Sequence, residues 1–275
     1  MDENKKTEMI NFDKEKDLML TFATSKGNLP KWHIGDYWYK VDSFGYENLA
    51  ECVISDLLEY SNVDNYVHYD LIKGILDNEV KNFSMSKSFI KGDETLITFY
   101  KLYFLNTNKE ITKDIVKYND ISERIKYVID FIHNMPGGVD ISKELTKTLE
   151  IDMFFLNEDR HFNNLALIRK SDKYFSYAPI FDNGLSLLSD TKEFNINKDI
   201  YECIEKIKGK PFSTLLEEQC MAAESLYGQQ LHFNFSNNDI QLVLEKYKDY
   251  YDDTIIKRVE TILYEQRRKY SYLFS

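Results

Sequence analysis

Apolar side chains recur at two different spacings along this 275-residue chain, and the change in spacing divides it into two parts. Residues 8–23 and 34–42 are rich in aromatic and β-branched side chains, which predicts extended strands on either side of a turn. In residues 47–60 the apolar side chains return every three or four positions, which predicts an amphipathic helix. Residues 84–94 predict a further strand that enters a turn at Gly92. The first part therefore predicts a small β-rich lobe with one helix.

The second part of the chain is dominated by helical spacing. Amphipathic patterns over residues 120–135 and 140–156 predict two helices, and further helical stretches follow towards the C-terminus. A polar break after the second helix leads into two apolar runs, which predict a hairpin joined around residues 171–173. The chain is therefore predicted to adopt an α+β fold with two lobes, an N-lobe over residues 1–94 and a larger helical C-lobe over residues 95–275.

Composition and charge restrict the partners that the protein is expected to have. The formal net charge of −11 disfavours sequence-independent binding to nucleic acid or anionic lipid. Cys52, Cys203 and Cys220 form no metal-binding or disulfide pattern. The charged N-terminal residues do not resemble a signal peptide, and no apolar run reaches the ~18 residues of a membrane span. We therefore expect a cytoplasmic protein with reduced cysteines, no direct nucleic-acid partner and no membrane partner, and leave export open.

The most informative polar residues lie in residues 155–184. Asp159 and Asn164 are five residues apart in the polar break, and Asp182 follows the predicted hairpin. Phosphoryl transfer requires a carboxylate that orients the attacking hydroxyl and accepts its proton, together with an Asn and an Asp that bind magnesium. Each residue alone is typical of a turn or a helix cap. Their order and spacing together predict a catalytic base at Asp159 and a Mg²⁺ and ATP site at Asn164 and Asp182.

A kinase also needs a lysine on an early strand, paired with a glutamate on a helix, to hold the α- and β-phosphates. Lys40 lies in an aromatic, strand-like run and fits this role. Glu47 and Glu51 follow one turn apart on the predicted helix. Either glutamate can reach Lys40, and the sequence does not choose between them. Taken without the downstream residues, Lys40 is typical of a solvated lysine on a strand.

The turn before Lys40 is a candidate phosphate-binding loop. Its backbone N–H groups and the side chains of Thr24, Ser25 and Lys26 can cover the phosphates. The turn has a single glycine, Gly27, where a glycine-rich loop has GxGxxG. An ordinary hairpin turn is therefore an equal alternative.

At these residues the sequence resembles the HipA-like serine/threonine kinases, and within that family the stand-alone CtkA branch. The resemblance spans most of the chain, from about Gly27 to the C-terminal helices. It rests on the segments WYKVDSFGYENLAE, SKSFIKGDE, LTKTLEIDMFFLNEDRHFNNLALI, APIFDNGLSLLSD and KPFSTLLEEQ. It implies a protein-kinase-like fold, ATP and Mg²⁺ as cofactors, and the transfer of phosphate to serine or threonine of a protein substrate, including the kinase itself.

The resemblance also implies roles for individual residues of the polar segment. Asp159 becomes the catalytic base, and Asn164 and Asp182 become the magnesium ligands. Lys40 becomes the lysine that contacts the phosphates, and His161 lies near the transferred phosphate. The assignments of Lys40, Asp159, Asn164 and Asp182 agree with the roles predicted from the residues themselves, whereas that of His161 comes from the resemblance alone.

Two further segments gain roles from the resemblance. The backbone of Phe89, Ile90 and Lys91 becomes the hinge that crosses the adenine site. Thr24 and Ser25 become candidate sites of autophosphorylation. HipA itself carries an additional segment before its kinase lobes, whereas this chain begins almost at the candidate phosphate loop. We therefore do not expect an antitoxin partner or a complex with DNA.

Several alternatives stay open at this stage. Arg160 either braces the catalytic loop or contacts the substrate. The DRHxxN motif does not report the acceptor, so a lipid or small-molecule kinase with the same core is one alternative, and a catalytically silent ATP-binding module is another. A metal hydrolase built from Asp159, His161 and Asp182 is the least favoured, because zinc hydrolases draw on several His, Glu or Cys ligands.

Overall fold

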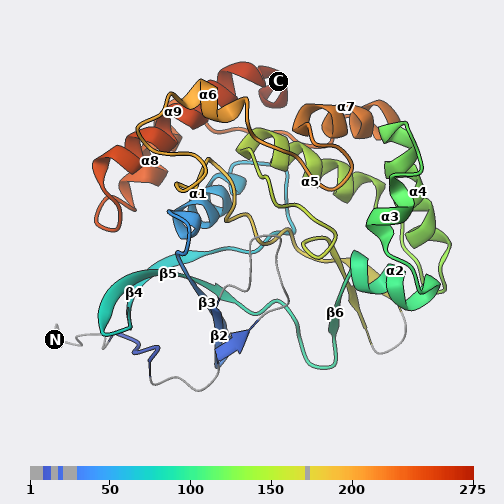
Figure 1. Ribbon diagram of the computed structural model, residues 1–275, viewed down its shortest axis with the longest axis horizontal. Helices are drawn as coiled ribbons and strands as arrows, with labels where there is room; N and C mark the ends of the chain where they lie inside the picture. The colour runs from blue at the N-terminus through green and yellow to red at the C-terminus, as the bar shows by residue number, and fades with distance from the viewer. Residues whose placement is uncertain (1–8, 14–17, 21–29, 171–173) are drawn as a thin grey trace.

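The computed structural model describes residues 9–13, 18–20, 30–170 and 174–275. Two antiparallel sheets lie along one side of the molecule and a layer of helices along the other (Figure 1). The first sheet has the strand order β1-β2-β3-β5-β4 and the second has the order β6-β7-β8. The strands are β1 (Leu18–Leu20), β2 (Pro30–Ile34), β3 (Tyr37–Val41), β4 (Asp70–Leu76), β5 (Glu79–Lys87), β6 (Thr95–Thr98), β7 (Ala166–Arg169) and β8 (Phe175–Tyr177).

The helices mostly follow the first sheet in the sequence. They are α1 (Glu47–Leu58), α2 (Phe99–Thr107), α3 (Ile111–Ile115), α4 (Ile121–Asn134), α5 (Ser142–Phe155), α6 (Ile200–Ile204), α7 (Leu216–Tyr227), α8 (Asn237–Glu245) and α9 (Asp253–Lys269), with a final 3₁₀ turn, η1 (Ser271–Phe274). Among the described residues, none of the helices has both the length and the apolar character that crossing a membrane requires.

The predicted α+β fold is confirmed, including the helices that correspond to α1, α4 and α5. The predicted hairpin is also present, because β7 pairs antiparallel with β8. Its connection, residues 171–173, lies outside the described residues. Along the chain, β5 is the last strand of the first sheet and β6 is the first strand of the second. The lobe boundary between residues 94 and 95 stays a prediction.

Aromatic residues and lysines alternate along β2 and β3, so they lie on opposite faces of the first sheet. Trp32, Tyr39 and Phe83 belong to one buried cluster, in which the ring of Phe83 stacks on Phe12 with centroids 4.0 Å apart. Lys31 is paired with Lys40 across β2 and β3, one position out of phase with these aromatic residues. Because successive side chains of a strand point to opposite faces, both lysines lie on the face away from the aromatic cluster.

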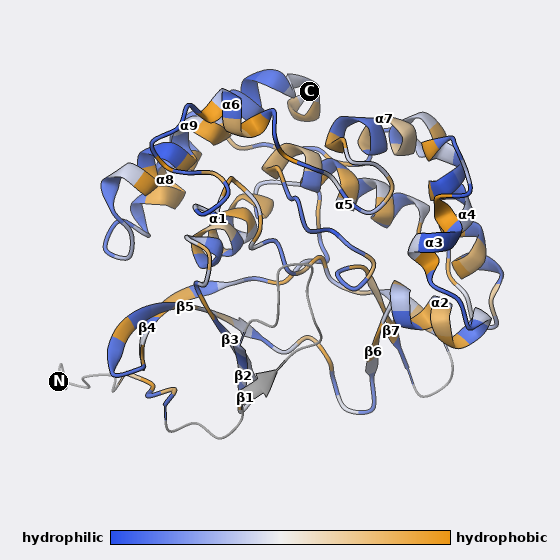
Figure 2. Ribbon diagram, in the orientation of Figure 1, coloured by the Kyte–Doolittle hydropathy of each residue, from blue (hydrophilic) through white to orange (hydrophobic). Residues whose placement is uncertain are grey.

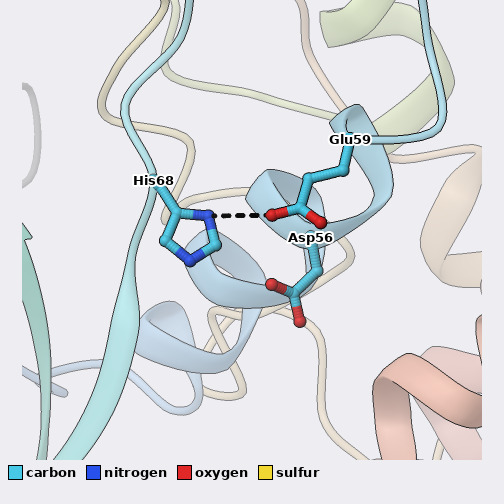
Figure 3. Close-up of side chains that lie close together, drawn as sticks. All are labelled: Asp56, Glu59 and His68. Atoms are coloured by element: carbon cyan, nitrogen blue, oxygen red, sulfur yellow. Dashed lines mark ion pairs between the residues drawn. The ribbon is translucent and has the colours of Figure 1, made fainter.

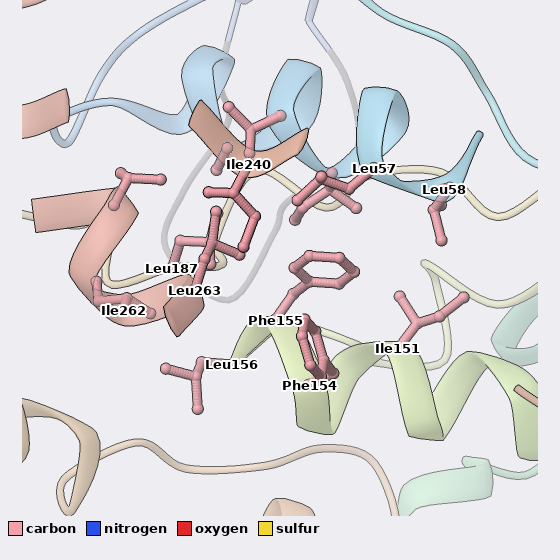
Figure 4. Packing of buried hydrophobic residues seen from close by; sticks show 14 of the residues in the cluster. Leu57, Leu58, Ile151, Phe154, Phe155, Leu156, Leu187, Ile240, Ile262 and Leu263 are labelled. Carbon is pink, nitrogen blue, oxygen red and sulfur yellow. The ribbon is translucent and has the colours of Figure 1, made fainter. Parts of the chain in front are cut away.

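Helix α1 departs from the amphipathic helix that the sequence predicts, because all twelve of its residues are buried. Its apolar residues join the main core with α5, α8 and α9, as Figure 4 shows for Leu57, Phe155 and Leu263. The polar residues of α1 are buried too, and they have partners inside the protein: the Asp56 carboxylate, for example, accepts from the Tyr247 hydroxyl at 2.8 Å. The hydropathy colouring shows the alternation of apolar and polar residues along the outer helices α4 and α9 (Figure 2).

Candidate active site

A pocket lies between the first sheet, helix α1 and the loops that follow α5 and β8. Its lining comes from two distant segments, residues 31–51 and 159–185, and comprises Lys31, Lys40, Val41, Glu47, Asn48, Glu51, Asp159, Asn164, Asp182, Gly184 and Leu185. Six residues predicted from the sequence are among them, although 142 positions separate Lys40 from Asp182. The fold therefore gathers the dispersed polar residues around one space.

Lys40 connects the two sides of this pocket. Its Nζ donates to Glu51 Oε1 at 2.5 Å and to Asp182 Oδ1 at 2.7 Å. The other oxygen of Glu51 accepts from the hydroxyl of Ser84 at 3.0 Å. Lys40 and Ser84 are directly paired across β3 and β5, so the register of the sheet brings both side chains to the same glutamate.

The two glutamates that the sequence left open therefore differ in what they contact. Glu51 pairs with Lys40, whereas Glu47 accepts hydrogen bonds from the backbone N–H groups of residues 43–45 at 2.6–3.0 Å. Three donors on one carboxylate fix the turn that leads from β3 into α1. Glu47 lines the pocket, but the structure uses its carboxylate to close this turn.

The turn that carries Asp182 approaches α1 closely. Asp182 has a φ of 60°, in the left-handed region that Asp tolerates better than most residues. A Cβ added at Gly184 would lie 3.3 Å from the Cβ of Glu47, closer than ordinary contact. Glycine at this position therefore lets the turn sit against the helix and brings Asp182 within reach of Lys40.

The lysines determine the charge of the pocket. Burial alone would raise the pKa of Asp182, but Lys31 and Lys40 outweigh burial and hold that pKa well below its usual range. Burial would lower the pKa of Lys40, but Asp182 and Glu51 raise it well above its usual value. Lys31 Nζ lies 3.7 Å from Asp182 Oδ2, and burial lowers its pKa. The pocket thus holds an ionised carboxylate beside two lysines.

Arg160 braces the loop that carries Asp159. Its side chain is fully buried, and its Nε lies 3.0 Å from Asp152 Oδ2 on α5. Its other nitrogens donate to the backbone oxygen of Phe181 at 2.6 Å and to the side-chain oxygen of Asn183. One arginine therefore ties α5 and the Asp159 loop to the Asp182 turn. This contact set favours bracing over contact with a substrate.

The backbone of this loop also fixes Asn164 relative to Asp159. Asn164 Nδ2 donates to the backbone oxygen of Asp159 at 2.9 Å. His161 Nε2 lies 3.7 Å from Asp159 Oδ2, and within the described residues neither ring nitrogen has a hydrogen-bond partner. The Asp159 carboxylate, almost wholly buried, accepts from Lys210 Nζ at 2.7 Å. The predicted base is thus paired with a lysine that comes from the segment before α7.

The predicted hinge residues lie beside a small apolar cluster of the second sheet. Phe89 and Ile90 pack against buried residues of β7 and the segment after β8, and the Phe89 ring lies 5.8 Å from that of Phe181. The backbone N–H of Lys91 donates to the side chain of Glu94 at 3.0 Å. Phe89, Ile90 and Lys91 do not line the pocket described above, so their role as a hinge stays a prediction.

The candidate phosphate loop falls in a part of the chain that the structure does not describe. Thr24, Ser25, Lys26 and Gly27 all lie within residues 21–29, outside the described residues. Their assignment stays a prediction. Strands β1 and β2, which flank this segment, pair antiparallel, with Leu20 opposite Pro30.

The polar residues of the pocket fit a magnesium ion by their chemistry. Magnesium takes oxygen ligands from carboxylates and amides and retains several waters. Asp182 offers a carboxylate whose ionised form is favoured. Asn164 commits its Nδ2 to the backbone of Asp159, which leaves its amide oxygen as the acceptor. Both side chains line the same pocket.

A second group of acidic residues lies elsewhere, at the end of α1. Figure 3 shows Asp56, Glu59 and His68, whose side-chain ligand atoms lie within 4.8 Å of one another. Asp56 is already engaged by Lys246 at 2.9 Å, and His68 lies 3.6 Å from Glu59. These contacts account for the cluster by linking the C-terminal end of α1 to the residue after α8 and to the segment before β4.

The sequence interpretation missed two lysines: Lys31, which lines the pocket, and Lys210, which contacts Asp159. Lys31 reaches Asp182 only because β2 pairs with β3 in a register that sets it opposite Lys40. Lys210 is separated from Asp159 by 51 positions, and no local pattern marks it. The segment KPFSTLLEEQ, which begins at Lys210, contributes to the family resemblance, but the sequence itself predicts no function for its residues.

The arrangement of the elements around the pocket is that of a kinase-like fold. A small antiparallel sheet, a buried helix with a glutamate on the strand lysine, and a helical lobe with an Asp/Asn loop and an Asp turn are arranged around one pocket. No protein-family model matches the sequence, and no curated protein does. The likeness appears in solved structures.

The proinflammatory kinase CtkA of Helicobacter pylori has a similar structure, with a TM-score of 0.65 and 18% sequence identity over 92% of this chain and 92% of CtkA. HipA of Shewanella oneidensis, solved with HipB and its operator DNA, has a TM-score of 0.52 and 9% identity over 91% of this chain and 63% of HipA. At these identities the likeness establishes the fold. The resemblance to HipA-like kinases is confirmed at that level.

Proposed function

We propose that the protein is an ATP-dependent kinase that transfers the γ-phosphate to serine or threonine hydroxyls of proteins, including its own. The observation that carries the proposal is the contact between Lys40 and both Glu51 and Asp182 in a pocket that also holds Asp159 and Asn164. A structural ion pair alone does not require a base and an amide oxygen beside it. Phosphoryl transfer uses all of these groups.

The residues divide the work between binding and proton transfer. Lys40 and Lys31, which line the pocket, bind the phosphates of ATP. The adenine binds beside the apolar side chains of Phe89 and Ile90. Asn164 and Asp182 hold Mg²⁺, which supplies charge neutralisation of the phosphates.

Asp159 orients the acceptor hydroxyl and receives its proton. A positioned general base contributes ~10²–10⁴-fold to the rate of such reactions. Arg160 keeps the Asp159 loop and the Asp182 turn in register through its contacts with both.

The deciding experiment incubates the purified protein with Mg²⁺ and γ-labelled ATP, followed by intact mass and phosphosite mapping. Asp159→Asn and Asp182→Asn remove a carboxylate charge with little change in shape and are expected to lower phosphotransfer at least ~10²-fold. Asp64→Asn is the matched control, because Asp64 is exposed and does not line the pocket. Melting curves show whether each variant is folded.

Each outcome has a defined meaning. Label on Ser or Thr of the wild type and of Asp64→Asn alone supports the proposal. Binding of Mg²⁺-ATP without label on protein points to a lipid or small-molecule acceptor, or to a silent ATP-binding module. Wild-type activity in folded Asp159→Asn or Asp182→Asn would refute the assigned roles.

A further inference from the structure

We propose that Lys210 is a further catalytic residue, which contacts the phosphoryl group during transfer and holds the Asp159 carboxylate in position beside it. The inference rests on the proposed function. The segment that begins at Lys210 has no role in the proposed function described above, and this inference assigns one to it. Lys210 Nζ donates to Asp159 Oδ1 at 2.7 Å, although the two residues lie 51 positions apart.

The loop that presents Lys210 is anchored from inside the protein. Gln219, on α7, is fully buried, and its Nε2 donates to the backbone oxygen of Lys210 at 2.8 Å. The same side chain accepts from the backbone N–H of Phe212 at 3.2 Å. Gly209 N donates to Thr214 O at 2.8 Å and closes the loop on itself. These hydrogen bonds hold the backbone of Lys210 in place and keep its side chain close to Asp159.

Apolar packing attaches the same loop to the catalytic segment. The ring of Phe212 meets the ring of Phe162 edge to face, with centroids 5.6 Å apart and both side chains buried. Arg124, on α4, donates to the backbone oxygen of Phe212 at 2.7 Å. Phe162 lies three residues after Asp159, so the two loops pack as one unit. The contact between Lys210 and Asp159 is therefore a product of the fold.

Exposure and charge distinguish Lys210 from a purely structural partner. Its side chain is 34% exposed, whereas that of Asp159 is 6% exposed, so the lysine is open to solvent beside the buried base and accessible to a substrate. A γ-phosphoryl group placed for in-line attack brings negative charge next to Asp159, which repels it. A fixed ammonium at this point neutralises both groups, and electrostatic stabilisation of this kind is worth most where it is already in place.

In the proposed reaction Lys210 neither gains nor loses a proton. The acceptor oxygen forms a bond to the γ-phosphorus while the bond from that phosphorus to the β,γ-bridging oxygen breaks. The electron pair of the broken bond leaves with ADP, and the acceptor proton passes to the Asp159 carboxylate. Lys210 stays protonated throughout and donates hydrogen bonds to Asp159 and to an oxygen of the moving phosphoryl group.

The test compares Lys210→Met, Lys210→Arg and Lys208→Met in the full-length protein. Lys208 is exposed in the same segment and makes a matched control for the loss of one positive charge. We expect Lys210→Met to lower kcat ~10²–10³-fold, the cost of losing one donor to a developing charge, with the KM for ATP within about threefold of wild type. Lys210→Arg keeps a cation and is expected to recover at least tenfold of that loss. Lys208→Met is expected to behave as wild type.

A binding measurement separates this proposal from the function on which it rests. Calorimetry with Mg²⁺-ADP, with and without aluminium fluoride as a mimic of the moving phosphoryl group, requires no turnover. Lys210→Met is expected to weaken the aluminium fluoride complex at least tenfold and to leave Mg²⁺-ADP affinity unchanged.

The outcomes are distinct. Wild-type or faster transfer by Lys210→Met, or aluminium fluoride binding that is independent of Lys210, overturns the role of Lys210 and leaves the kinase proposal standing. An equal loss of Mg²⁺-ADP affinity and of kcat assigns Lys210 to loop structure and also overturns it. A wild-type protein that binds no Mg²⁺-ADP and transfers no phosphate overturns both proposals together.

Discussion

Two carboxyl groups in different parts of the molecule, Asp182 partly buried and Glu150 fully buried, differ in whether they are ionised. Asp182 lies in the pocket, in contact with the ammonium groups of Lys31 and Lys40. Glu150 lies on α5 in the helical part, where one oxygen accepts from the backbone N–H of Gln230 at 2.9 Å and the other has no hydrogen-bond partner among the described residues. Burial acts on both carboxylates in the same direction, so the difference between them comes from their neighbours.

The pKa values express this difference. Burial and the neighbouring carboxyl of Glu224 raise the pKa of Glu150 to about 8, so the folded protein keeps it protonated near neutral pH. In the pocket, lysines reverse the effect of burial and keep Asp182 ionised. The lysines beside Asp182 and the carboxyl beside Glu150 therefore account for the difference between these two groups.

The largest expected effect comes from removing a cation that a buried carboxylate depends on. Arg160→Met leaves Asp152 fully buried without its partner, and we expect the free energy of unfolding to fall by ~3–5 kcal/mol. Chemical denaturation measures the change. Arg169→Met, on the exposed end of β7, removes the same charge and is expected to change stability little. Equal losses in the two variants would contradict the comparison.

A smaller effect is expected from the glutamate that balances Lys40. Glu51→Gln weakens a charge-assisted hydrogen bond, which is worth ~1.5–3 kcal/mol, so kcat/KM for ATP is expected to fall by about 10–100-fold. Glu47→Gln is the control from the same helix, because Glu47 accepts backbone N–H groups and does not contact Lys40. We expect it to act mainly on the melting temperature. Similar kcat/KM values for the two variants would contradict the assignment of Glu51.

The smallest effect tests the protonated carboxylate. The pKa of Glu150 is about 8 in the folded protein and ~4.5 when unfolded, so between these values only the folded state holds the proton and stability falls as pH rises. Glu150→Gln removes this dependence. The stability of the variant relative to wild type is expected to increase by ~2 kcal/mol between pH 5 and pH 7. Denaturant titrations at both pH values provide the measurement, and a difference that does not change with pH would argue against the raised pKa.

The sequence predicts the parts of the site that depend on short-range spacing. Asp159, Asn164 and Asp182 are brought together by a loop and a hairpin that follow one another in the chain, and a local pattern is enough to propose them. The strand that carries Lys40 is also a local feature. The predicted α+β fold has the same origin, because helices such as α1, α4 and α5 are indicated by the spacing of their own apolar residues.

The site residues that the sequence does not predict are positioned by contacts between distant segments of the chain. The choice between Glu47 and Glu51 is made by how α1 rotates against the sheet, which the helix pattern does not report. Lys31 requires the register of β2 against β3, and Lys210 requires the packing of the α7 segment on the Asp159 loop. Side chains placed by register and packing leave no spacing signal in a single sequence.

The buried state of α1 restricts how the protein can be controlled. A helix whose twelve residues are all buried, with Leu49, Val53 and Leu57 in the main core, cannot swing outward without exposing them. Each such side chain costs ~1.5–3 kcal/mol to hydrate, so a displaced helix is too rare to serve as an off state. Glu51 is carried by this helix and is therefore held in place beside Lys40 by the packing of the main core.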